Sequence, residues 1–180
     1  GSEFPLGLTN VTYAATDASG NINSCLFSVK VVDTELPKMF CPPSVTRSMD
    51  AGASTYTHMF VTNSTDNDVV TNTTISHPSG TKFEKASTLV TYTATDASGN
   101  TASCHFTVTV IDTELPQVNC PPSVASSTDE GNNTFTYNFA TSSSDNDVAS
   151  APATSITHPS GTRFGMGSTR VTYSSVDASN

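Results

Sequence analysis

The middle of the chain contains two stretches in which apolar and polar positions alternate. From Ser87 to Thr95, one face of the alternation carries Val90, Tyr92 and Ala94. From Thr101 to Ile111, it gathers Cys104, Phe106, Val108 and Val110. A period of two residues is typical of a β-strand with one buried face. The intervening residues 96–100 include Gly99, which tolerates positive φ, so the pattern predicts a β-hairpin.

Shorter strands are predicted before this hairpin, over Tyr56–Val61 and Val69–Ile75, with a turn at His77–Gly80. No helical period extends beyond a few residues. Six or seven short strands in one unit are typical of a β-sandwich, so the sequence predicts an all-β, immunoglobulin-like fold. Tyr92 resembles the corner tyrosine of an immunoglobulin strand F, two residues before the usual cysteine. Ala94 occupies that cysteine position, so the usual inter-sheet disulfide is expected to be absent.

Several motifs recur along the chain in the same order. They are Val-Thr-Tyr at 11–13, 90–92 and 171–173, Asp-Ala-Ser-Gly-Asn at 17–21 and 96–100, and Cys-Pro-Pro-Ser-Val at 41–45 and 120–124. Most corresponding positions lie 79 residues apart, and those after the Asp-Asn-Asp motif at 145–147 lie 81 apart because of a two-residue insertion. Self-similarity at a fixed period indicates tandem repeats.

The repeat boundaries divide the chain into one complete unit and two partial ones. Residues 33–112 are predicted to form a complete repeat, and residues 5–32 to be the C-terminal fragment of a preceding one. Residues 113–180 are predicted to be a following repeat that lacks its last strand. Residues 1–4, Gly-Ser-Glu-Phe, match the translation of two adjacent cloning sites and are left out of the fold prediction.

Composition and charge exclude several classes of function. Seven Lys and Arg residues against sixteen Asp and Glu residues give a net charge of −9. Such a chain repels phosphate backbones, so no nucleic-acid partner is expected. No stretch approaches the roughly 20 apolar residues of a membrane helix. The sequence has no nucleophile elbow, phosphate-binding glycine loop or zinc signature, and its histidines form no recurring cluster, so we predict that it is not an enzyme.

The four cysteines fall two per repeat equivalent. Cys41 and Cys104 lie in the complete repeat, and a disulfide between them would join its first and last strands, which are neighbours in such a sandwich. The alternative is two buried free thiols. A disulfide would indicate an oxidising, extracellular compartment. Four glycosylation motifs also favour a secreted or cell-surface protein, at Asn10, Asn63, Asn72 and Asn132.

Cys25 and Cys120 are predicted to have no partner within their own partial repeats. One chain's N-terminal strand could complete the C-terminal repeat of another by strand addition, which would bring these two cysteines together. Such contacts are head-to-tail and can extend into fibres.

The succession of motifs resembles the hyalin repeat, or HYR domain, across residues 5–180. The order is Asp-Thr-x-x-Pro, Cys-Pro-Pro, Asp-Asn-Asp, Pro-Ser-Gly-Thr-x-Phe, Val-Thr-Tyr-x-Ala-Thr-Asp-Ala-Ser-Gly-Asn and Cys-x-Phe-x-Val-x-Val. The resemblance implies an immunoglobulin-like sandwich, one cysteine pair per repeat and tandem arrays in secreted or cell-surface proteins. It also implies cell adhesion and assembly with calcium.

The acidic loops are the candidate binding sites. In an immunoglobulin-like sandwich, two loops lie at the end where the chain enters. This would gather five acids at the first repeat junction, Asp33, Glu35, Asp66, Asp68 and Asp96. The next junction offers Asp112, Glu114, Asp145, Asp147 and Asp177. Carboxylates are the ligands that Ca²⁺ prefers, and a bound ion would stiffen the linker. The alternative is that these aspartates serve only as turn formers.

Three readings of function remain at this point. The first is a non-catalytic structural and adhesive module whose partners are extracellular-matrix or cell-surface proteins. The second is an ectodomain that recognises a ligand or carbohydrate through its loops, although the chain has no Trp to build a sugar platform. The third is an accessory module of a secreted multidomain protein.

Overall fold

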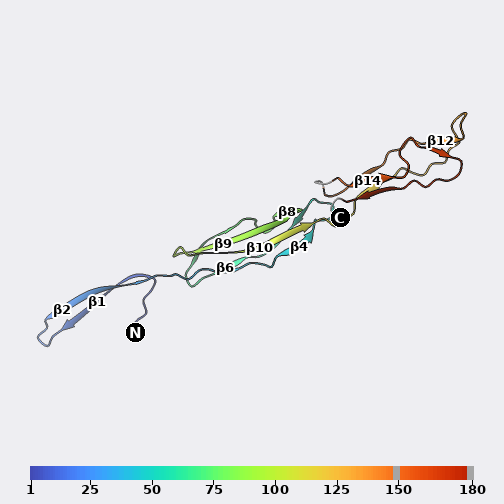
Figure 1. The fold of residues 1–180 in the computed structure, drawn as a ribbon. Helices are drawn as coiled ribbons and strands as arrows, with labels where there is room; N and C mark the ends of the chain where they lie inside the picture. The colour runs from blue at the N-terminus through green and yellow to red at the C-terminus, as the bar shows by residue number, and fades with distance from the viewer. Residues whose placement is uncertain (148–150, 178–180) are drawn as a thin grey trace. The chain divides into compact units, whose positions relative to one another are not determined.

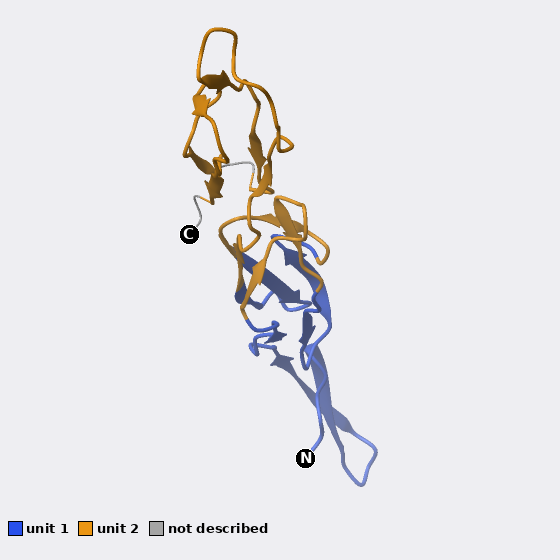
Figure 2. Cartoon of the chain, turned by 90° about the vertical axis from the view of Figure 1, so that its right-hand side faces the viewer, with its two compact units in different colours: residues 1–43, 60–78, 89–106 blue, residues 44–59, 79–88, 107–180 orange. Residues whose placement is uncertain are grey.

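The computed structural model describes residues 1–147 and 151–177, all of which are strand, turn or irregular structure (Figure 1). The described residues contain no helix that is long and apolar enough to span a bilayer. The chain divides into two compact units (Figure 2). Unit 1 comprises residues 1–43, 60–78 and 89–106, and unit 2 comprises residues 44–59, 79–88 and 107–180. The predicted all-β fold is therefore confirmed.

The N-terminal segment is a two-stranded hairpin. Strand β1 (Gly7–Thr16) pairs antiparallel with β2 (Ile22–Val31), with Tyr13 opposite Cys25. The turn between them is held by Asp17, whose Oδ1 accepts the backbone N–H groups of Ser19 and Asn21, each at 2.9 Å. Among the described strands, β2 pairs only with β1. Several of its apolar side chains are exposed, among them Phe27 by 51% and Leu26 by 67%.

Residues 33–112, predicted to be the complete repeat, have an all-β structure consistent with an immunoglobulin-like sandwich. Its strands are β3 (Lys38–Phe40), β4 (Val45–Ser48), β5 (Thr55–Thr57), β6 (Asn63–Thr65), β7 (Val70–Ile75), β8 (Lys82–Glu84), β9 (Ser87–Asp96) and β10 (Thr101–Ile111). One sheet has the order β4-β10-β9-β7, and β3-β6 and β5-β8 form two further pairs. β10 lies between β9, with which it forms a hairpin, and β4, to which it runs parallel with Val108 opposite Val45.

The alternating positions form the core, as predicted. In unit 1, the buried apolar side chains are Val90, Tyr92, Ala94 and Phe106. In unit 2, they are Met49, Phe83, Val108 and Val110. Gly99 has a φ of 91°, so the predicted hairpin turn depends on glycine at this position.

Two details differ from the sequence prediction. The strand predicted over Tyr56–Val61 is only the three residues of β5, because its partner β8 is equally short. Phe60 lies beyond β5 and instead packs edge-on against Phe106, with ring centroids 4.9 Å apart. In the part of the chain that the structure describes, the hydroxyl of Tyr92 bonds to Ser64 Oγ at 3.1 Å instead of to nearby backbone as in a tyrosine corner.

Cys41 and Cys104 form the predicted disulfide, with a Cα–Cα distance of 6.0 Å. Cys41 follows β3, and Cys104 lies within β10. Cys25 and Cys120 are free and exposed.

Residues 113–177 form shorter strands that pair two by two. They are β11 (Gln117–Asn119) with β13 (Ser142–Ser144), β12 (Thr134–Thr136) with β15 (Arg163–Gly165), and β14 (Ala153–Ile156) with β16 (Tyr173–Val176). By their place in the repeat, β11 to β16 correspond to β3 and β5 to β9. Residues 124–127, which correspond to β4, form no strand.

Candidate cation sites at the repeat junctions

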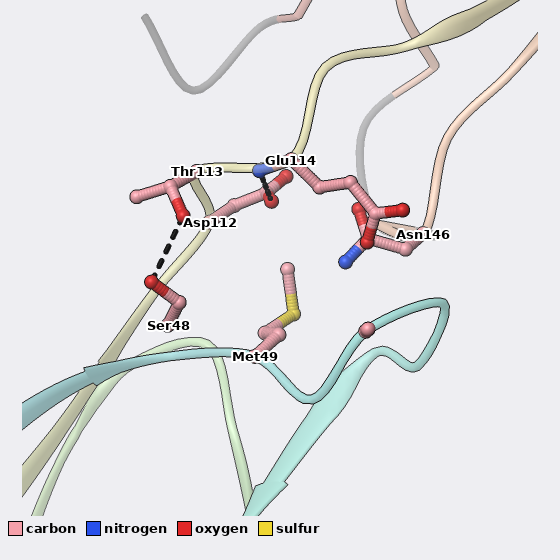
Figure 3. A pocket seen from close by; sticks show the side chains of 7 residues that line it. Ser48, Met49, Asp112, Thr113, Glu114 and Asn146 are labelled. Carbon is pink, nitrogen blue, oxygen red and sulfur yellow. Dashed lines mark hydrogen bonds between the residues drawn. The ribbon is translucent and has the colours of Figure 1, made fainter.

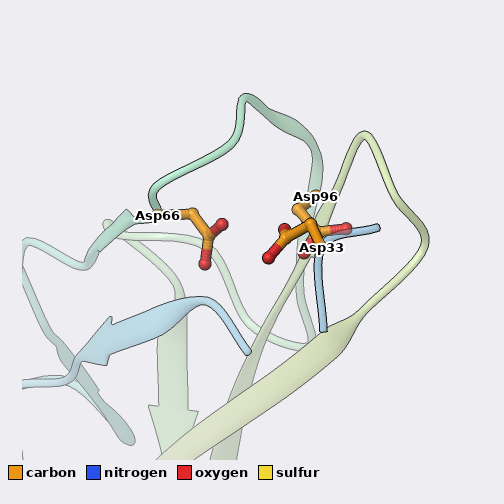
Figure 4. A group of neighbouring side chains, drawn as sticks. All are labelled: Asp33, Asp66 and Asp96. Carbon is orange, nitrogen blue, oxygen red and sulfur yellow. The ribbon is translucent and has the colours of Figure 1, made fainter. Parts of the chain in front are cut away.

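Three aspartates from different parts of unit 1 converge at the first junction (Figure 4). Asp33 follows β2, Asp66 follows β6, and Asp96 ends β9. Each offers a carboxylate oxygen, and these oxygens lie within 4.8 Å of one another. Two ligands of one Ca²⁺ ion, each 2.3–2.6 Å from it, cannot be much further apart than this. The spacing of this first trio therefore suits a single ion.

Local backbone geometry orients the carboxylates of Asp33 and Asp66. Asp33 Oδ1 accepts the N–H of Glu35 at 3.1 Å, and Asp66 Oδ1 accepts the N–H of Asp68 at 3.0 Å. These are Asx turns, in which a side chain substitutes for backbone. Asn67 Nδ2 also donates to Asp33 Oδ1, at 3.2 Å. In both aspartates one oxygen is thus fixed by the turn.

The second oxygen of each of these carboxylates has no protein partner. Oδ2 of Asp33 and Oδ2 of Asp66 are buried without a hydrogen bond. Leaving a buried polar atom unpaired is costly, more so when it is charged. Turn formation alone requires only Oδ1, so it does not account for burying Oδ2. The two atoms are therefore positioned as if for a further ligand.

Asp96 is 2% exposed and is held by Asn100. The backbone N–H of Asn100 donates to Asp96 Oδ1 at 2.8 Å, and its Nδ2 donates to Oδ2 at 2.9 Å. Burial by itself raises the pKa of Asp96, but the hydrogen bonds from Asn100, Gly99 and Ser98 outweigh it and leave the pKa below its usual value. The carboxylate is thus kept ionised, as a metal ligand must be.

The second junction, in unit 2, has a similar group formed by Asp112, Asp147 and Asp177. The orphan atoms recur here as well, because Oδ2 of Asp112 and Oδ2 of Asp145 are buried and unpartnered. Their Oδ1 atoms accept the N–H groups of Glu114 and Asp147, at 3.1 and 2.9 Å. Each junction therefore has two aspartates, each with one carboxylate oxygen held by an N–H group and one without a partner. The two pairs lie 79 residues apart in sequence.

The second trio differs from the first in having a positive charge beside it. Lys85 Nζ forms a salt bridge with Asp147. This hydrogen bond raises the pKa of Lys85, against the opposing effect of burial, and the charges of Asp147, Asp177 and Asp112 raise it further. Within the described residues, no Lys or Arg forms a salt bridge with a member of the first trio.

Asp112 experiences the crowding of like charges. Burial raises its pKa, as do the charges of Asp177, Asp145 and Asp147, and the N–H of Glu114 only partly offsets them.

A pocket of about 270 Å³ lies beside Asp112 (Figure 3). It is lined by Ser48, Met49, Ala51, Asp112, Thr113, Glu114 and Asn146. Asn146 Oδ1 is a further buried oxygen without a partner.

Four of the predicted acids lie outside the trios. Glu35 is exposed, Asp68 accepts Ser98 Oγ at 3.0 Å, and Glu114 Oε2 accepts the N–H of Gly52 at 3.0 Å. Asp145 is not a member of the second trio, which contains Asp147 instead, but its charge raises the pKa of Asp112. Sequence reasoning missed Lys85 and Asn100. Asn100 could have been predicted, because an asparagine follows the turn glycine in both copies of the Asp-Ala-Ser-Gly-Asn motif, at positions 21 and 100.

The other candidate residues are dispersed. The asparagines of the four glycosylation motifs, Asn10, Asn63, Asn72 and Asn132, are all exposed, as the modification requires. His58 lies 3.4 Å from the Tyr56 hydroxyl, and its pKa is lowered by burial and by the charge of Arg47. His77 and His158 contact the hydroxyls of the residues before them, Ser76 and Thr157.

The fold and the repeated junctions define a class of tandem β-sandwich modules. The chain belongs to the HYR domain family, which matches residues 1–31, 32–110 and 111–180. It is 36% identical to hyalin of Strongylocentrotus purpuratus and 33% identical to hyalin of Lytechinus variegatus, over 99% of its length in both cases. It is also 40% identical, over 59% of its length, to the Rattus norvegicus protein named sushi, von Willebrand factor type A, EGF and pentraxin domain-containing protein 1.

These relatives are much longer proteins. The chain spans 16% and 36% of the two hyalins and 3% of the rat protein. No solved structure matches the chain.

Proposed function

We propose that this chain is a stretch of an extracellular, adhesion-type array whose repeat junctions bind Ca²⁺. The observation that carries the proposal is the recurrence of unpartnered carboxylate oxygens, on Asp33 and Asp66 and again on Asp112 and Asp145. Each pair lies at a point where one repeat follows another. Ca²⁺ would supply the missing partner of these atoms and would bridge residues that are distant in sequence.

The disulfide and the family support the extracellular setting. Cys41–Cys104 requires an oxidising compartment to form and persist. Free Ca²⁺ outside cells is high enough to occupy sites of the weak kind found in extracellular modules, with Kd of about 10⁻⁴–10⁻³ M. Tight binding is therefore unnecessary. An array stiffened by such sites would present its loops at fixed spacing to matrix or cell-surface partners.

A thermal melt in 5 mM CaCl₂ against excess EDTA, at matched ionic strength, tests the proposal. At the Kd range above, binding would stabilise the folded state by roughly 1–2 kcal/mol. The variant Asp66→Asn keeps the Oδ1 that accepts the Asp68 N–H but replaces the orphan Oδ2 with an amide. We expect it to lose the contribution of the first junction.

Asp50→Asn is the matched control. Asp50 is an exposed loop aspartate that accepts the N–H of Thr57 at 3.0 Å and lies outside both trios. It should retain the full calcium response. Identical melts with and without Ca²⁺ in the unsubstituted protein would reject the proposal and leave the trios as turn formers.

A further inference from the structure

The four-stranded sheet of the complete repeat has an open edge at β7. The sheet order is β4-β10-β9-β7, and among the described strands β7 pairs only with β9. β7 has six residues, whereas β4, the strand at the other edge, has four. The unpaired N–H and C=O groups along such an edge can recruit a strand of another chain, and native proteins protect them.

Two common forms of edge protection are absent from β7. Charged side chains and prolines usually discourage pairing at an edge. The sequence of β7, Val-Thr-Asn-Thr-Thr-Ile, contains neither, whereas β4 carries Arg47. Its four central residues are all exposed. β7 does contain a β-bulge, which is a third form of protection, but the bulge lies at the start of the strand and leaves residues 72–75 in regular pairing with β9.

The bulge also determines which way Asn72 faces. Val70 and Asn72 are two residues apart and would share one face of a regular strand. Here Val70 lies opposite the buried Asp96, and Asn72 lies opposite Thr95, on the other face of β9. Thr71 lies at the register shift, and its Oγ1 donates to the carbonyl oxygens of Thr95 and Asp96, at 3.2 and 3.0 Å. The bulge therefore turns Asn72 from the core face to the solvent face.

Asn72 begins a glycosylation motif whose two recognised side chains share this outer face. Residues 72–74 are Asn-Thr-Thr, which has the required form Asn-x-Thr. Thr74 lies opposite Thr93, so it is on the same face as Asn72. Both side chains are exposed, and in the described part of the chain no hydrogen bond engages the Asn72 amide. The folded repeat can therefore accommodate a large group on Asn72.

We propose that Asn72 carries an N-linked oligosaccharide and that this glycan covers the open edge of β7. A bulky, hydrated group near the middle of the strand keeps other strands away from its free N–H and C=O groups, as a charge or a proline does at other edges. The glycan thus supplies the protection that the sequence of β7 lacks. This inference shares with the proposed function only the extracellular setting, and it does not depend on Ca²⁺.

The donor of the glycan is a lipid-linked oligosaccharide diphosphate of the secretory pathway. The Asn72 Nδ2 attacks the anomeric carbon of the first sugar, and a C–N bond forms as the C–O bond to the diphosphate breaks. The lipid diphosphate leaves with that electron pair, and the amide gives up one proton to a base of the transferase. The step is a group transfer without oxidation or reduction.

Secretion of the unsubstituted chain from cultured animal cells tests the modification. Digestion before aspartates separates Asn72 from the neighbouring motif at Asn63, because Asp66 and Asp68 lie between them. Enzymatic release of the glycan in heavy-oxygen water converts a modified asparagine into labelled aspartate. Mass spectrometry should find the label at position 72. An unlabelled Asn72 in the secreted protein would overturn the proposal, and it would leave the response of the melt to Ca²⁺ untouched.

Two substitutions of Thr74 test the protective role. Thr74→Ala removes the motif and leaves the edge bare, whereas Thr74→Lys removes the motif and places a charge on the strand. Thr74 is exposed, so neither change removes core packing. Both are made in a Cys25→Ser/Cys120→Ser background, so that the exposed thiols cannot link copies. After secretion and incubation in EDTA, size-exclusion chromatography should show loss of monomer for Thr74→Ala and retention of monomer for Thr74→Lys.

A general effect of charge on solubility would act in the opposite direction, because a lysine moves the net charge of −9 towards zero. Asn63→Gln is the matched control. Asn63 is exposed on β6, which pairs with β3 and not with β7, so its loss should leave the amount of monomer unchanged. Equal losses of monomer for Thr74→Ala and Thr74→Lys, or no loss for either, would contradict protection of the β7 edge by the glycan.

Discussion

Lys85 and Asp147 form a salt bridge at the second junction, where Asp147 is 4% exposed. The corresponding position at the first junction is Leu6, which has no charge to offer. The ammonium group of Lys85 thus partly neutralises the negative charge of the second trio. Among the described residues, the first trio has no such cationic partner. The two junctions are therefore expected to depend on Ca²⁺ to different extents.

We predict that Lys85→Leu, which copies the first junction, makes the second junction bind Ca²⁺ more tightly. An ion entering the wild-type site meets the repulsion of Lys85, and the substitution removes it. A gain of roughly tenfold in affinity would correspond to about 1.4 kcal/mol. Calorimetric titration in an Asp66→Asn background, which silences the first junction, measures this site alone.

The reciprocal change provides the control. Leu6→Lys should weaken binding at the first junction and leave the second unaltered. Equal affinities before and after Lys85→Leu would show that the ammonium does not compete with the cation.

A second prediction compares two equivalent valines. Val90→Ala should destabilise the complete repeat by about 2 kcal/mol, because Val90 is fully buried. Val171→Ala should cost no more than about 0.5 kcal/mol, because Val171 is 38% exposed. Hydrogen exchange at the amides of Tyr92 and Tyr173, in the Cys25→Ser/Cys120→Ser background, reports each repeat separately. Similar losses in both would contradict the difference in burial between the two valines.

The disulfide gives a third prediction. Cys41 and Cys104 are 63 residues apart, so their bond restricts the unfolded chain and stabilises the repeat by about 4 kcal/mol in the chain-entropy model. Cys41→Ala/Cys104→Ala should lower the urea midpoint of the complete repeat accordingly. Cys25→Ser/Cys120→Ser, which removes only the free thiols, is the control and should leave that midpoint unchanged. A midpoint that stays the same without the disulfide would place the stability in the core alone.

The strands and the trios were predictable to different degrees, for physical reasons. The alternation over β9 and β10 records which side chains are buried, so it predicted both strands and their core faces. Phe60 was wrongly predicted to lie in a strand. Its apolar side chain packs against another aromatic ring, and in the sequence such a residue looks the same as a buried strand residue. The proximity of Asp33, Asp66 and Asp96 was predicted, because the segments that carry them lie at the same end of an immunoglobulin-like sandwich. The place of Asp147 in the second trio could not be predicted in this way, and Asp147 forms its salt bridge with Lys85, which lies 62 residues away in sequence.

The last prediction concerns Asp17 in the turn of the β1–β2 hairpin. Its pKa lies below the usual 3.8 because Asn21 Nδ2 donates to its carboxylate, and the N–H groups of Asn21, Ser19 and Gly20 lower the pKa further, against the opposing effect of burial. A lowered pKa in the folded state means that ionised Asp17 stabilises the hairpin above pH 3.8, and that this stabilisation is lost as the pH falls through the folded-state pKa. Carbon-detected NMR of the Asp17 carboxyl should give a midpoint below 3.8. Asn21→Ala removes the largest cause and should move the midpoint upward, with faster hydrogen exchange at the Ser19 amide. If the midpoint does not move, Asn21 is not what holds this carboxylate ionised.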